Sequence, residues 1–470
     1  MFFKQIWTEG LAAATYLVGA EGGEVAVVDP LRDVDRYLDA AREAGVRITH
    51  ILETHIHADF CSGARELAAR TGAALHLSDE GDAEWQYAFP HQSLHDGDTV
   101  TVGGVRITAV HTPGHTPEHL MYLLAEGDGP PTHALTGDFL FVGDVGRPDL
   151  LGLGAAERLG DQLYDSVQTK LAGLPDALEV WPAHGAGSLC GKAMGTERST
   201  TLGAQRLTNY ALQPMTREEF VRTVLAGQPA APAYFRRMKT INRDGPPILV
   251  GVPAVLALSA VEVKKRLDVG AVPVDLRHPL QFAPAHLPGS VNISHDPTLS
   301  SWAGAVLDPA QPVIFITNHP ETLDDAARQL IRVGLDHIAG YLDGGVAAWQ
   351  AAGLPAAAMP LVAPEALLAA QAAGNGPFVL DVRSQSEWDA GHVPDAFFIP
   401  LTQLANEWPE IAEAHGLTKE TPVAVMCAAG HRSSIGASLL RRMGYTGAGS
   451  VPGGFTAYRR LQRPAGSATR

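Results

Sequence analysis

Six histidine and aspartate side chains, carried by four short motifs, are placed to bind a metal ion. The motifs are ETHIHADFCSG, HTPGHTP, LTGDFL and WPAHG, and the candidate ligands are His55, His57, Asp59, His115, Asp138 and His184. Each of the three later motifs contains a glycine, which lets the backbone turn sharply. Imidazoles and carboxylates delivered from separate loops are typical of hydrolytic or oxidative metal sites. One such motif would be a weak signal, but four in order predict a metal centre.

Hydrophobic patterning predicts the elements that must position these residues. Short β-rich runs such as EVAVVDP alternate with helical runs such as DVDRYLDAAREAG through the first 200 residues, which predicts an α/β domain. The apolar run ITHILET leads directly into His55, so the first motif lies at the carboxyl end of a strand. Gly103-Gly104 predicts a hairpin turn, and TREE from Thr216 predicts a capped helix start. Residues 228–247, rich in Pro and Ala, are expected to connect this domain to the next.

A second candidate site lies near the end of the chain. The stretch CAAGHRSS places Cys427 directly after the apolar run PVAVM and before a predicted helix, and four residues separate Cys427 from Arg432. The N–H groups of such a loop, and the helix N-terminus, can face the sulfur and stabilise a thiolate. A buried structural cysteine is the alternative. Gly430 and Arg432 follow Cys427 at the spacing that such a loop needs, and they favour a nucleophilic cysteine.

The second half of the chain repeats itself. VDLRHPLQFAPAHLPGS and LDVRSQSEWDAGHVPDA both contain Asp-x-Arg, and in each a histidine stands eleven residues after the aspartate. The register continues downstream, which predicts two α/β copies of about 110 residues each. In the earlier copy Thr317 stands where the later copy has Cys427, and neither the loop glycine nor Arg432 has a counterpart. Threonine lacks the thiolate that sulfur chemistry needs, so the earlier copy is expected to be catalytically silent.

Length, charge and cysteine usage narrow the class of protein. A chain of 470 residues predicts two to four domains. A net charge of −16 disfavours nucleic acid and anionic membranes as partners. The longest apolar stretch, 248–261, is too short for a membrane span, and the first residues lack a signal-peptide pattern. Three distant cysteines suit a reducing compartment, so a cytoplasmic location is expected.

The metal motifs resemble those of the metallo-β-lactamase fold, and within it the glyoxalase II and persulfide dioxygenase branch, over residues 1 to about 210. Glyoxalase II enzymes use T-H-x-H-x-D-H to hold two metal ions, and the last histidine serves the second ion. Phe60 stands at that position here, and phenylalanine cannot ligate. A second ion would be left with Asp59, His184 and a bridging Asp138. One metal ion is therefore expected.

In the persulfide dioxygenase family, two histidines and an aspartate hold a single iron. The resemblance carries these ligands over to His55, His115 and Asp138, and implies one Fe(II) per chain. Such a set leaves positions open for a substrate and for dioxygen. The residues expected to hold water or to orient the ligands are His57, Asp59 and His184.

Two further residues have open roles at this site. VGDVGRPDL resembles the family's Gly-Arg stretch, in which the arginine contacts the thiol substrate, so Arg147 is the candidate for substrate contact. A structural salt bridge from Arg147 to Asp144 or Asp149 is the alternative. Cys190, in GSLCGKAMG, is flanked by glycines and Lys192, which favour exposure and a lowered pKa. Simple packing and a thiol role near the metal pocket both remain open for Cys190.

Residues 360–470 resemble an active rhodanese domain, because the sulfurtransferases of that family also separate cysteine and arginine by four residues. Protein tyrosine phosphatases have five residues there, which makes a wider cradle for phosphate. The expected fold class is α/β multidomain. It comprises a metallo-β-lactamase αββα sandwich with a helical connector (1–245), a silent rhodanese-like domain (246–358) that acts as a spacer or docking surface, and an active rhodanese domain (359–470).

This domain order resembles fused persulfide dioxygenase–sulfurtransferases. The resemblance implies that iron oxidises a small thiol persulfide, such as glutathione persulfide, with O2 to sulfite and free thiol. Cys427, with Arg432, would form or use thiosulfate. The alternatives are a glyoxalase II-like zinc thioester hydrolase with a sulfurtransferase domain, and a non-catalytic sulfur carrier or sensor. The thiol that carries the persulfide and the formation of a homo-oligomer are left open.

Overall fold

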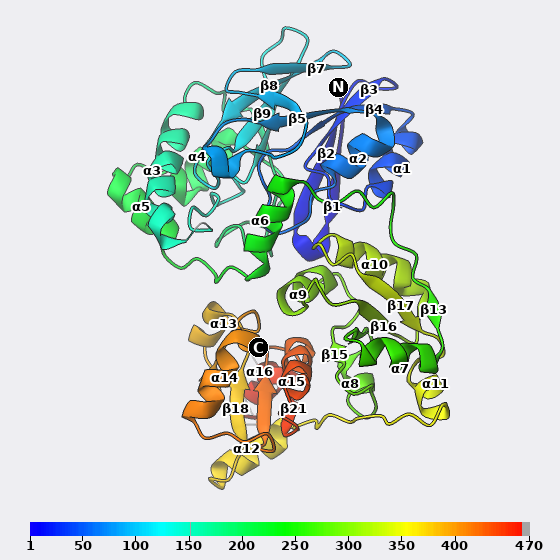
Figure 1. Ribbon diagram of the computed structural model, residues 1–470. Helices are drawn as coiled ribbons and strands as arrows, with labels where there is room; N and C mark the ends of the chain where they lie inside the picture. The colour runs from blue at the N-terminus through cyan, green and yellow to red at the C-terminus, as the bar shows by residue number, and fades with distance from the viewer. Residues whose placement is uncertain (151, 463–470) are drawn as a thin grey trace, which may run out of the picture. The chain divides into compact units, whose positions relative to one another are not determined.

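The computed structural model describes residues 1–150 and 152–462, and these form two compact units (Figure 1). The first unit comprises Met1–Val252 with Ile331–Gly334, and the second comprises Pro253–Leu330 and the residues from Leu335 onward. The domain boundaries expected at residues 245 and 358 stay a prediction. Among the helices described, none combines the length and the apolar character needed to cross a membrane.

Two six-stranded sheets form the centre of the first unit. In sheet order, the first sheet contains β1 (Phe2–Thr8), β2 (Ala13–Gly19), β3 (Glu24–Val28), β4 (Arg47–Leu52), β5 (Ala74–Ser78) and β6 (Gln92–Leu94). The second contains β12 (Thr200–Thr201), β11 (Glu179–Pro182), β10 (His133–Gly137), β9 (Leu120–Glu126), β8 (Val105–His111) and β7 (Thr99–Val102). The main helices of this unit are α1 (Asp35–Ala44), α2 (Ala64–Thr71), α3 (Leu153–Lys170), α4 (Leu202–Thr208), α5 (Arg217–Leu225) and α6 (Tyr234–Asp244).

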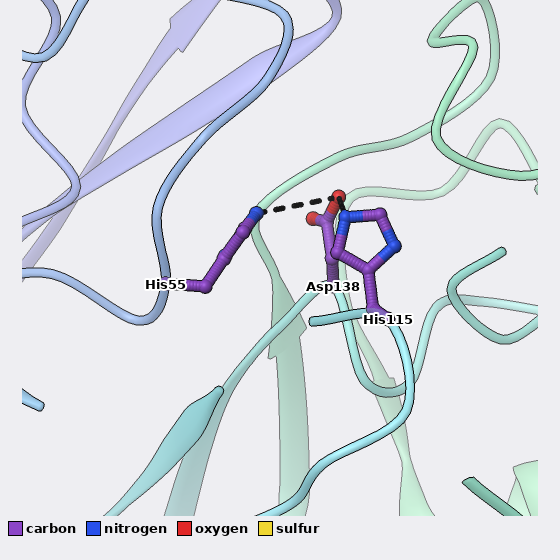
Figure 2. A group of neighbouring side chains, drawn as sticks. All are labelled: His55, His115 and Asp138. Carbon is purple, nitrogen blue, oxygen red and sulfur yellow. Dashed lines mark ion pairs between the residues drawn. The ribbon is translucent and has the colours of Figure 1, made fainter. Parts of the chain in front are cut away.

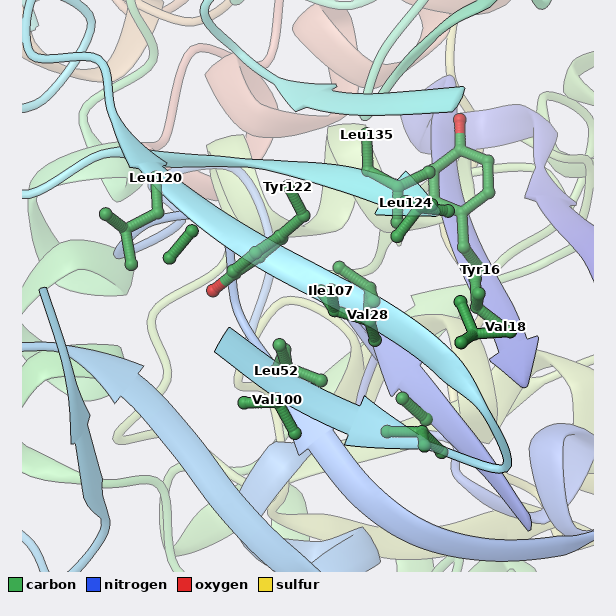
Figure 3. Close-up of a cluster of buried hydrophobic side chains, with 14 of the residues drawn as sticks. Tyr16, Val18, Val28, Leu52, Val100, Ile107, Leu120, Tyr122, Leu124 and Leu135 are labelled. Atoms are coloured by element: carbon green, nitrogen blue, oxygen red, sulfur yellow. The ribbon is translucent and has the colours of Figure 1, made fainter. Parts of the chain in front are cut away.

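Three buried hydrophobic clusters hold these layers together. One lies between the two sheets and joins, for example, Val28 of β3 to Ile107 of β8 (Figure 3). A second packs α1 and α2 on the first sheet through residues such as Tyr37. A third packs α3 and α5 on the second sheet through residues such as Phe220. The layers are helix, sheet, sheet and helix, so the predicted αββα sandwich is confirmed.

The local turn and cap signals are also confirmed. Gly103 and Gly104 join β7 to β8 with φ values of 56° and 84°, the left-handed region that favours glycine. Thr216 caps α5, and Glu219 completes the capping box by accepting a hydrogen bond from the Thr216 N–H. The connecting segment 228–247 contains α6.

Two parallel sheets form the second unit, one for each sequence repeat. The first contains β13 (Ala257–Leu258), β17 (Ile338–Leu342), β16 (Val313–Ile316), β14 (Val272–Asp275) and β15 (Val291–Asn292). The second contains β19 (Phe397–Phe398), β18 (Phe378–Asp381), β20 (Val423–Met426) and β21 (Ala448–Ser450). The helices used below are α7 (Ala260–Asp268), α8 (Pro279–Phe282), α13 (Gln385–Asp389) and α15 (His431–Arg442). Parallel strands with helical crossovers are the predicted α/β architecture.

Candidate metal centre and cysteine loop

Three loops bring His55, His115 and Asp138 together (Figure 2). His55 lies beyond the end of β4, His115 beyond the end of β8, and Asp138 directly after β10. All three side chains are buried. Asp138 Oδ2 lies 3.3 Å from His115 Nε2 and 3.9 Å from His55 Nε2. The two imidazoles and the carboxylate therefore face one common point, although they come from distant parts of the chain.

The atoms that face this point lack hydrogen-bond partners. Within the described residues, His55 Nε2, His115 Nε2 and Asp138 Oδ2 are buried and have no hydrogen-bond partner. Buried polar atoms without partners cost free energy, and native structures contain few of them. Two imidazole nitrogens and one carboxylate oxygen are a donor set that binds divalent iron or zinc. His55, His115 and Asp138 are thus suited to bind a metal ion.

Hydrogen bonds on the far side of each imidazole set its tautomer. His115 Nδ1 donates to the Arg147 carbonyl at 3.0 Å. His55 Nδ1 lies 2.9 Å from Thr54 Oγ1, and Thr54 already donates its only hydroxyl proton to Asp29 Oδ2. His55 Nδ1 must therefore be the donor in its pair. Both rings carry their proton on Nδ1, which leaves the Nε2 lone pairs free for a metal.

The pKa values of the three side chains favour the same protonation states. Burial, and next the neighbouring His57, lower the pKa of His55 well below its usual range, and burial also lowers the pKa of His115. Burial raises the pKa of Asp138, but His184 and His115 outweigh this effect and hold it well below its usual range. Neutral imidazoles and an ionised carboxylate are the forms that bind metal.

His119 is a further residue at this site, which the motif analysis missed. Its Nε2 accepts a hydrogen bond from the Asp138 backbone N–H at 3.0 Å, and its Nδ1 lies 2.8 Å from Thr112 Oγ1. Burial, and next His115, lower the pKa of His119 to about 3, so the ring is neutral and able to accept. His119 therefore helps to fix Asp138. The sequence signal was its place four residues after His115, just beyond the motif.

His57 turns its Nε2 atom toward two buried carboxylates. That atom lies 3.1 Å from Asp29 Oδ1 and 3.4 Å from Glu53 Oε2. Burial lowers the pKa of His57, but Asp29 outweighs this effect and raises the value to about 9. Phe60 stacks on the ring with 4.2 Å between centroids. Within the described part of the chain, His57 Nδ1 is buried and has no hydrogen-bond partner. Because the raised pKa keeps a proton on both ring nitrogens, Nδ1 could bind a metal only after it loses its proton.

Both ring nitrogens of His184 bond to carboxylates. Nδ1 lies 2.8 Å from Asp138 Oδ1, and Nε2 lies 2.9 Å from Asp59 Oδ2. A ring bonded in this way carries a proton on each nitrogen. Burial lowers the pKa of His184, but Asp138 and Asp59 raise it well above its usual range. In this arrangement neither nitrogen is free for a second metal ion, and the imidazolium adds a positive charge beside Asp138.

Cys190 lies beside the metal pocket. Its ligand atom lies within 4.8 Å of those of Asp59 and His184. Only 1% of the residue is exposed, and burial, with the Asp138 and Asp59 carboxylates, raises the pKa of its thiol well above the usual range. The Lys192 ammonium donates instead to backbone carbonyls around the end of α5. The exposure and lowered pKa expected from its flanking residues are therefore wrong, and a thiol role stays a prediction.

Arg147 is buried in a salt bridge with Asp149. Its Nε and Nη2 donate to the two carboxylate oxygens at 2.7 and 2.8 Å, and its Nη1 donates to the Leu189 carbonyl at 3.0 Å. Its own carbonyl accepts from His115 Nδ1. The alternative expected for Arg147, a structural salt bridge, is thus present, and its partner is Asp149. Substrate contact by Arg147 stays a prediction.

The connector helix α6 braces the first metal motif. Asn242 Nδ2 donates to the carbonyls of His57 and Phe60, each at 2.7 Å, and Asn242 Oδ1 accepts from the Ser62 N–H at 2.8 Å. Asn242 is buried. A segment expected only to connect domains therefore fixes the backbone of the loop that carries His55, His57 and Asp59. Sequence patterning offers no signal for this long-range contact.

Cys427 lies at the end of β20, in a loop that leads into α15. Its Sγ accepts a hydrogen bond from the Gly430 N–H at 3.0 Å and lies 3.6 Å from Ser433 Oγ. Gly430 has a φ of 111°, which favours glycine. At Gly454, a side-chain Cβ would stand 2.2 Å from the Cys427 carbonyl oxygen, so only glycine fits there. The backbone thus turns the Gly430 N–H toward the sulfur, and a nucleophilic role for Cys427 stays a prediction.

The loop of the earlier copy has a different hydrogen-bond pattern. Thr317 Oγ1 accepts from the His319 N–H at 2.9 Å. Pro320 stands at the position equivalent to Gly430, and proline has no N–H to donate. Thr322 stands at the position equivalent to Arg432. This loop therefore lacks the cysteine, the N–H donor at the Gly430 position and the arginine of the later copy, which supports the prediction of a silent copy.

Thr317→Cys alone is expected to leave this copy inactive, because the loop would still have Pro320 and Thr322 in place of the glycine and the arginine that accompany Cys427. Cyanide-dependent sulfur transfer, measured in a Cys427→Ser background, checks this prediction. The expected rate equals that of Cys427→Ser alone. Appreciable transfer by the added cysteine would contradict it and would mean that the earlier loop retains a working cradle.

The earlier copy also contacts the helix that begins at the cysteine loop. Ser434 Oγ, in α15, donates to Asn292 Oδ1 at 2.5 Å, and the Asn292 N–H donates to Ser438 Oγ at 3.0 Å. Asn292 is buried, and its Nδ2 donates to the carbonyls of Asp275 and Arg277. The earlier copy thus supports α15, the helix whose N-terminus faces the sulfur.

Family models match both units of the chain. Residues 8–184 match the metallo-beta-lactamase superfamily, and residues 259–352 and 363–461 match the rhodanese-like domain. Among curated relatives, the mitochondrial persulfide dioxygenase ETHE1 of Bos taurus is 28% identical over 229 residues, which cover 48% of this chain and 80% of the relative. A hydroxyacylglutathione hydrolase of Rhodospirillum rubrum is 36% identical over 172 residues, which cover 36% of this chain and 60% of the relative.

A solved structure extends the likeness beyond the first unit. The crystal structure of a metallo-beta-lactamase from Staphylococcus aureus subsp. aureus COL is 35% identical, with a TM-score of 0.65. The match covers 72% of this chain and 98% of that one. The chain therefore belongs to the metallo-beta-lactamase superfamily, and its metallo-beta-lactamase fold is followed by two rhodanese-like domains.

Proposed function

We propose that this protein is a persulfide dioxygenase coupled to a sulfurtransferase. At the metal centre, a small thiol persulfide such as glutathione persulfide reacts with O2 and water to give the free thiol, sulfite and two protons. At Cys427, sulfur passes between a cysteine persulfide and sulfite. The first reaction uses one Fe(II) per chain and makes the sulfite that the second consumes.

The observation that carries the first activity is the unpaired set of His55 Nε2, His115 Nε2 and Asp138 Oδ2. Two histidines and one carboxylate form the three-ligand set of non-haem Fe(II) oxygenases, in which other positions stay open for substrate and oxygen. His184 bonds to carboxylates through both nitrogens, and Phe60 replaces a ligating side chain. These features support one ion. The similarity to a persulfide dioxygenase agrees with this assignment.

Bound Fe(II) would supply the activation of O2. The chain's own residues orient the ligands and keep water out. His119 and His184 fix Asp138, through its backbone N–H and its Oδ1 atom respectively. Hydrogen bonds at Nδ1 fix the rings of His55 and His115. Because all of these side chains are buried, the metal ligands are held rigidly in a place with little water.

The second activity depends on Cys427. Sulfite attacks the outer sulfur of the Cys427 persulfide, a new sulfur–sulfur bond forms in thiosulfate, and the Cys427 thiolate leaves with the electron pair of the broken bond. The reverse reaction starts from thiosulfate and releases sulfite. The Gly430 N–H lies 3.0 Å from Sγ and stabilises the thiolate. The rhodanese-like match over residues 363–461 supports this activity.

The experiment that tests the first activity follows oxygen and sulfite together. Purified protein receives glutathione persulfide in air-saturated buffer, and initial rates of oxygen uptake and sulfite formation are measured. The expected result is that the protein accelerates both, with one sulfite formed, free or captured as thiosulfate, for each O2 consumed. Persulfide loss without oxygen uptake would contradict the proposal.

A second candidate function is supported by His57. Its Nδ1 atom is unpaired, and its Nε2 atom faces Asp29 at 3.1 Å, the carboxylate–histidine pairing common among metal-binding histidines. With His57 as a third nitrogen ligand, the site would suit Zn2+ and hydrolysis of a thioester. A hydroxyacylglutathione thioester therefore serves as the competing substrate. Hydrolysis by zinc-loaded protein, without oxygen uptake by iron-loaded protein, would favour this second function.

A further inference from the structure

The carboxylate of Glu387 holds both terminal nitrogens of Arg432. Arg432 Nη1 donates to Glu387 Oε2 and Nη2 donates to Oε1, each at 2.7 Å. This is the fork geometry in which an arginine and a carboxylate bind most strongly. The Cys427 sulfur accepts its hydrogen bond from Gly430 instead. The arginine of the loop is therefore committed to a carboxylate on α13, and not to the sulfur.

Comparison of the two repeats distinguishes the Glu387–Arg432 ion pair from an ion pair that supports the fold of both copies. In both copies an arginine pairs with the aspartate two residues before it, as Arg277 does with Asp275 and Arg383 with Asp381. Glu387 stands six residues after its aspartate, and the earlier copy has Gln281 at that place. The earlier copy thus keeps the buried Asp–Arg pair but lacks the cysteine, the loop arginine and the glutamate together. Glu387 therefore occurs only in the copy that has the cysteine and the loop arginine, which links it to the cysteine loop and not to the fold that both copies share.

Glu387 has one structural role that needs a control. It is the third residue of α13 and forms a capping box with Ser384. Glu262 has the same role at the start of α7, where it bonds to Ser259. A glutamine can also complete a capping box. Glu387→Gln therefore keeps the cap and removes the charge, and Glu262→Gln makes the same change at a helix without a cysteine loop.

The exposure and the charges of the Glu387–Arg432 pair allow it to act on the sulfur. Glu387 and Arg432 have side-chain exposures of 33% and 20%, so the pair is reachable from solvent. Burial raises the pKa of Glu387, but its hydrogen bonds with Arg432 outweigh this effect and lower the value to about 2. Glu387 is thus ionised whenever Cys427 reacts. A guanidinium freed from Glu387 would be attracted to the thiolate of Cys427, and once the thiol is ionised, a thiolate stabilised by a cation is intrinsically a weaker nucleophile than a free one.

We propose that Glu387 is a positioning residue for sulfur transfer, which holds the Arg432 guanidinium off the Cys427 sulfur. Arg432 then attracts an anionic sulfur donor or acceptor to the loop, while the thiolate stays free to attack. This inference rests on the proposed sulfurtransferase function. It assigns the glutamate of α13 to the same site as the cysteine and the arginine.

The test compares Glu387→Gln, Glu387→Asp, Arg432→Gln, the double variant Glu387→Gln/Arg432→Gln and the control Glu262→Gln. Sulfur transfer from thiosulfate to cyanide gives kcat and KM. Alkylation of Cys427 by iodoacetamide, measured over a pH range up to full ionisation of the thiol and followed by mass spectrometry of its peptide, gives a second rate that needs no sulfurtransferase activity. Thermal unfolding of each variant shows whether a cap has been lost.

The expected result for Glu387→Gln is a fall in kcat and in the alkylation rate of about tenfold, within the range of coupling between contacting charges, with KM for thiosulfate unchanged or lower. Glu387→Asp should recover part of both rates, and Glu262→Gln should match the wild type. In the Arg432→Gln background, Glu387→Gln should add no further fall in either rate, because Glu387 acts only through Arg432.

Unchanged rates in Glu387→Gln would overturn the proposal, as would an equal fall in the Arg432→Gln background. A similar fall in Glu262→Gln would also overturn it and would assign the effect to helix capping. If the wild type transfers no sulfur while the alkylation rates follow the expected pattern, the sulfurtransferase function is wrong and the placement of Arg432 by Glu387 stands.

Discussion

Replacing His115 with alanine is expected to abolish iron binding and oxygen consumption together. His115 Nε2 is one of the three buried atoms without a hydrogen-bond partner that face the metal position, and its removal leaves only His55 and Asp138 of that group of ligands. Loss of this ligand should lower oxygen uptake with glutathione persulfide by more than about 100-fold, since even outer-shell partners of metal ligands change activity by 10- to 100-fold. Asp138→Ala should behave in the same way.

His133→Ala is the matched control for this prediction. His133 begins β10, the strand whose other end leads into Asp138, and it pairs with Glu179 at 3.4 Å instead of facing the metal position. Iron content and oxygen uptake should stay near wild-type values in this variant. If His115→Ala still bound one iron per chain and consumed oxygen at the wild-type rate, the ligand assignment would be wrong.

Replacing Cys427 with serine is expected to leave oxygen consumption intact and to change the product from thiosulfate to sulfite. The cysteine loop forms its own hydrogen-bond cradle, and its N–H donor comes from Gly430 in the same loop. The candidate metal ligands all lie between residues 55 and 138, in the other compact unit. Serine lacks a thiolate, so transfer from thiosulfate to cyanide should fall to the background rate.

The fair comparison for Cys427→Ser uses initial rates at low persulfide, because sulfite also reacts spontaneously with sulfur species. Sulfite should then accumulate at the rate at which oxygen disappears. If the variant lost oxygen uptake as completely as His115→Ala while keeping its iron, Cys427 would have to deliver substrate to the metal. The two activities would then not be independent.

The grouping of the candidate metal ligands could be expected from sequence because each lies in or next to a short motif that follows a strand. His55 follows the run ITHILET, and a strand end fixes the direction of the backbone beyond it. The alternation of short strands and helices predicted an α/β domain, the resemblance to the metallo-β-lactamase fold implied the αββα layers, and the two later domains followed from their repeat. These features are local, so hydrophobic periodicity and motif spacing carry them.

The supporting residues could not be predicted because their roles depend on contacts between distant parts of the chain. Asn242 bonds to carbonyls about 180 residues earlier in the chain, and Glu387 pairs with an arginine 45 residues later. The expectation that Cys190 is exposed was wrong for the same reason. Its flanking glycines and Lys192 suggested an open loop, but tertiary packing buries the thiol beside two carboxylates.

The most direct test of the central claim is the metal content of protein purified without oxygen, followed by oxygen uptake on glutathione persulfide by the same sample. Two histidines and one aspartate with unpaired ligand atoms, beside a His184 bonded at both nitrogens, predict one iron per chain and persulfide-dependent oxygen uptake that scales with iron content. Two zinc ions per chain, with thioester hydrolysis and no oxygen uptake, would contradict the account.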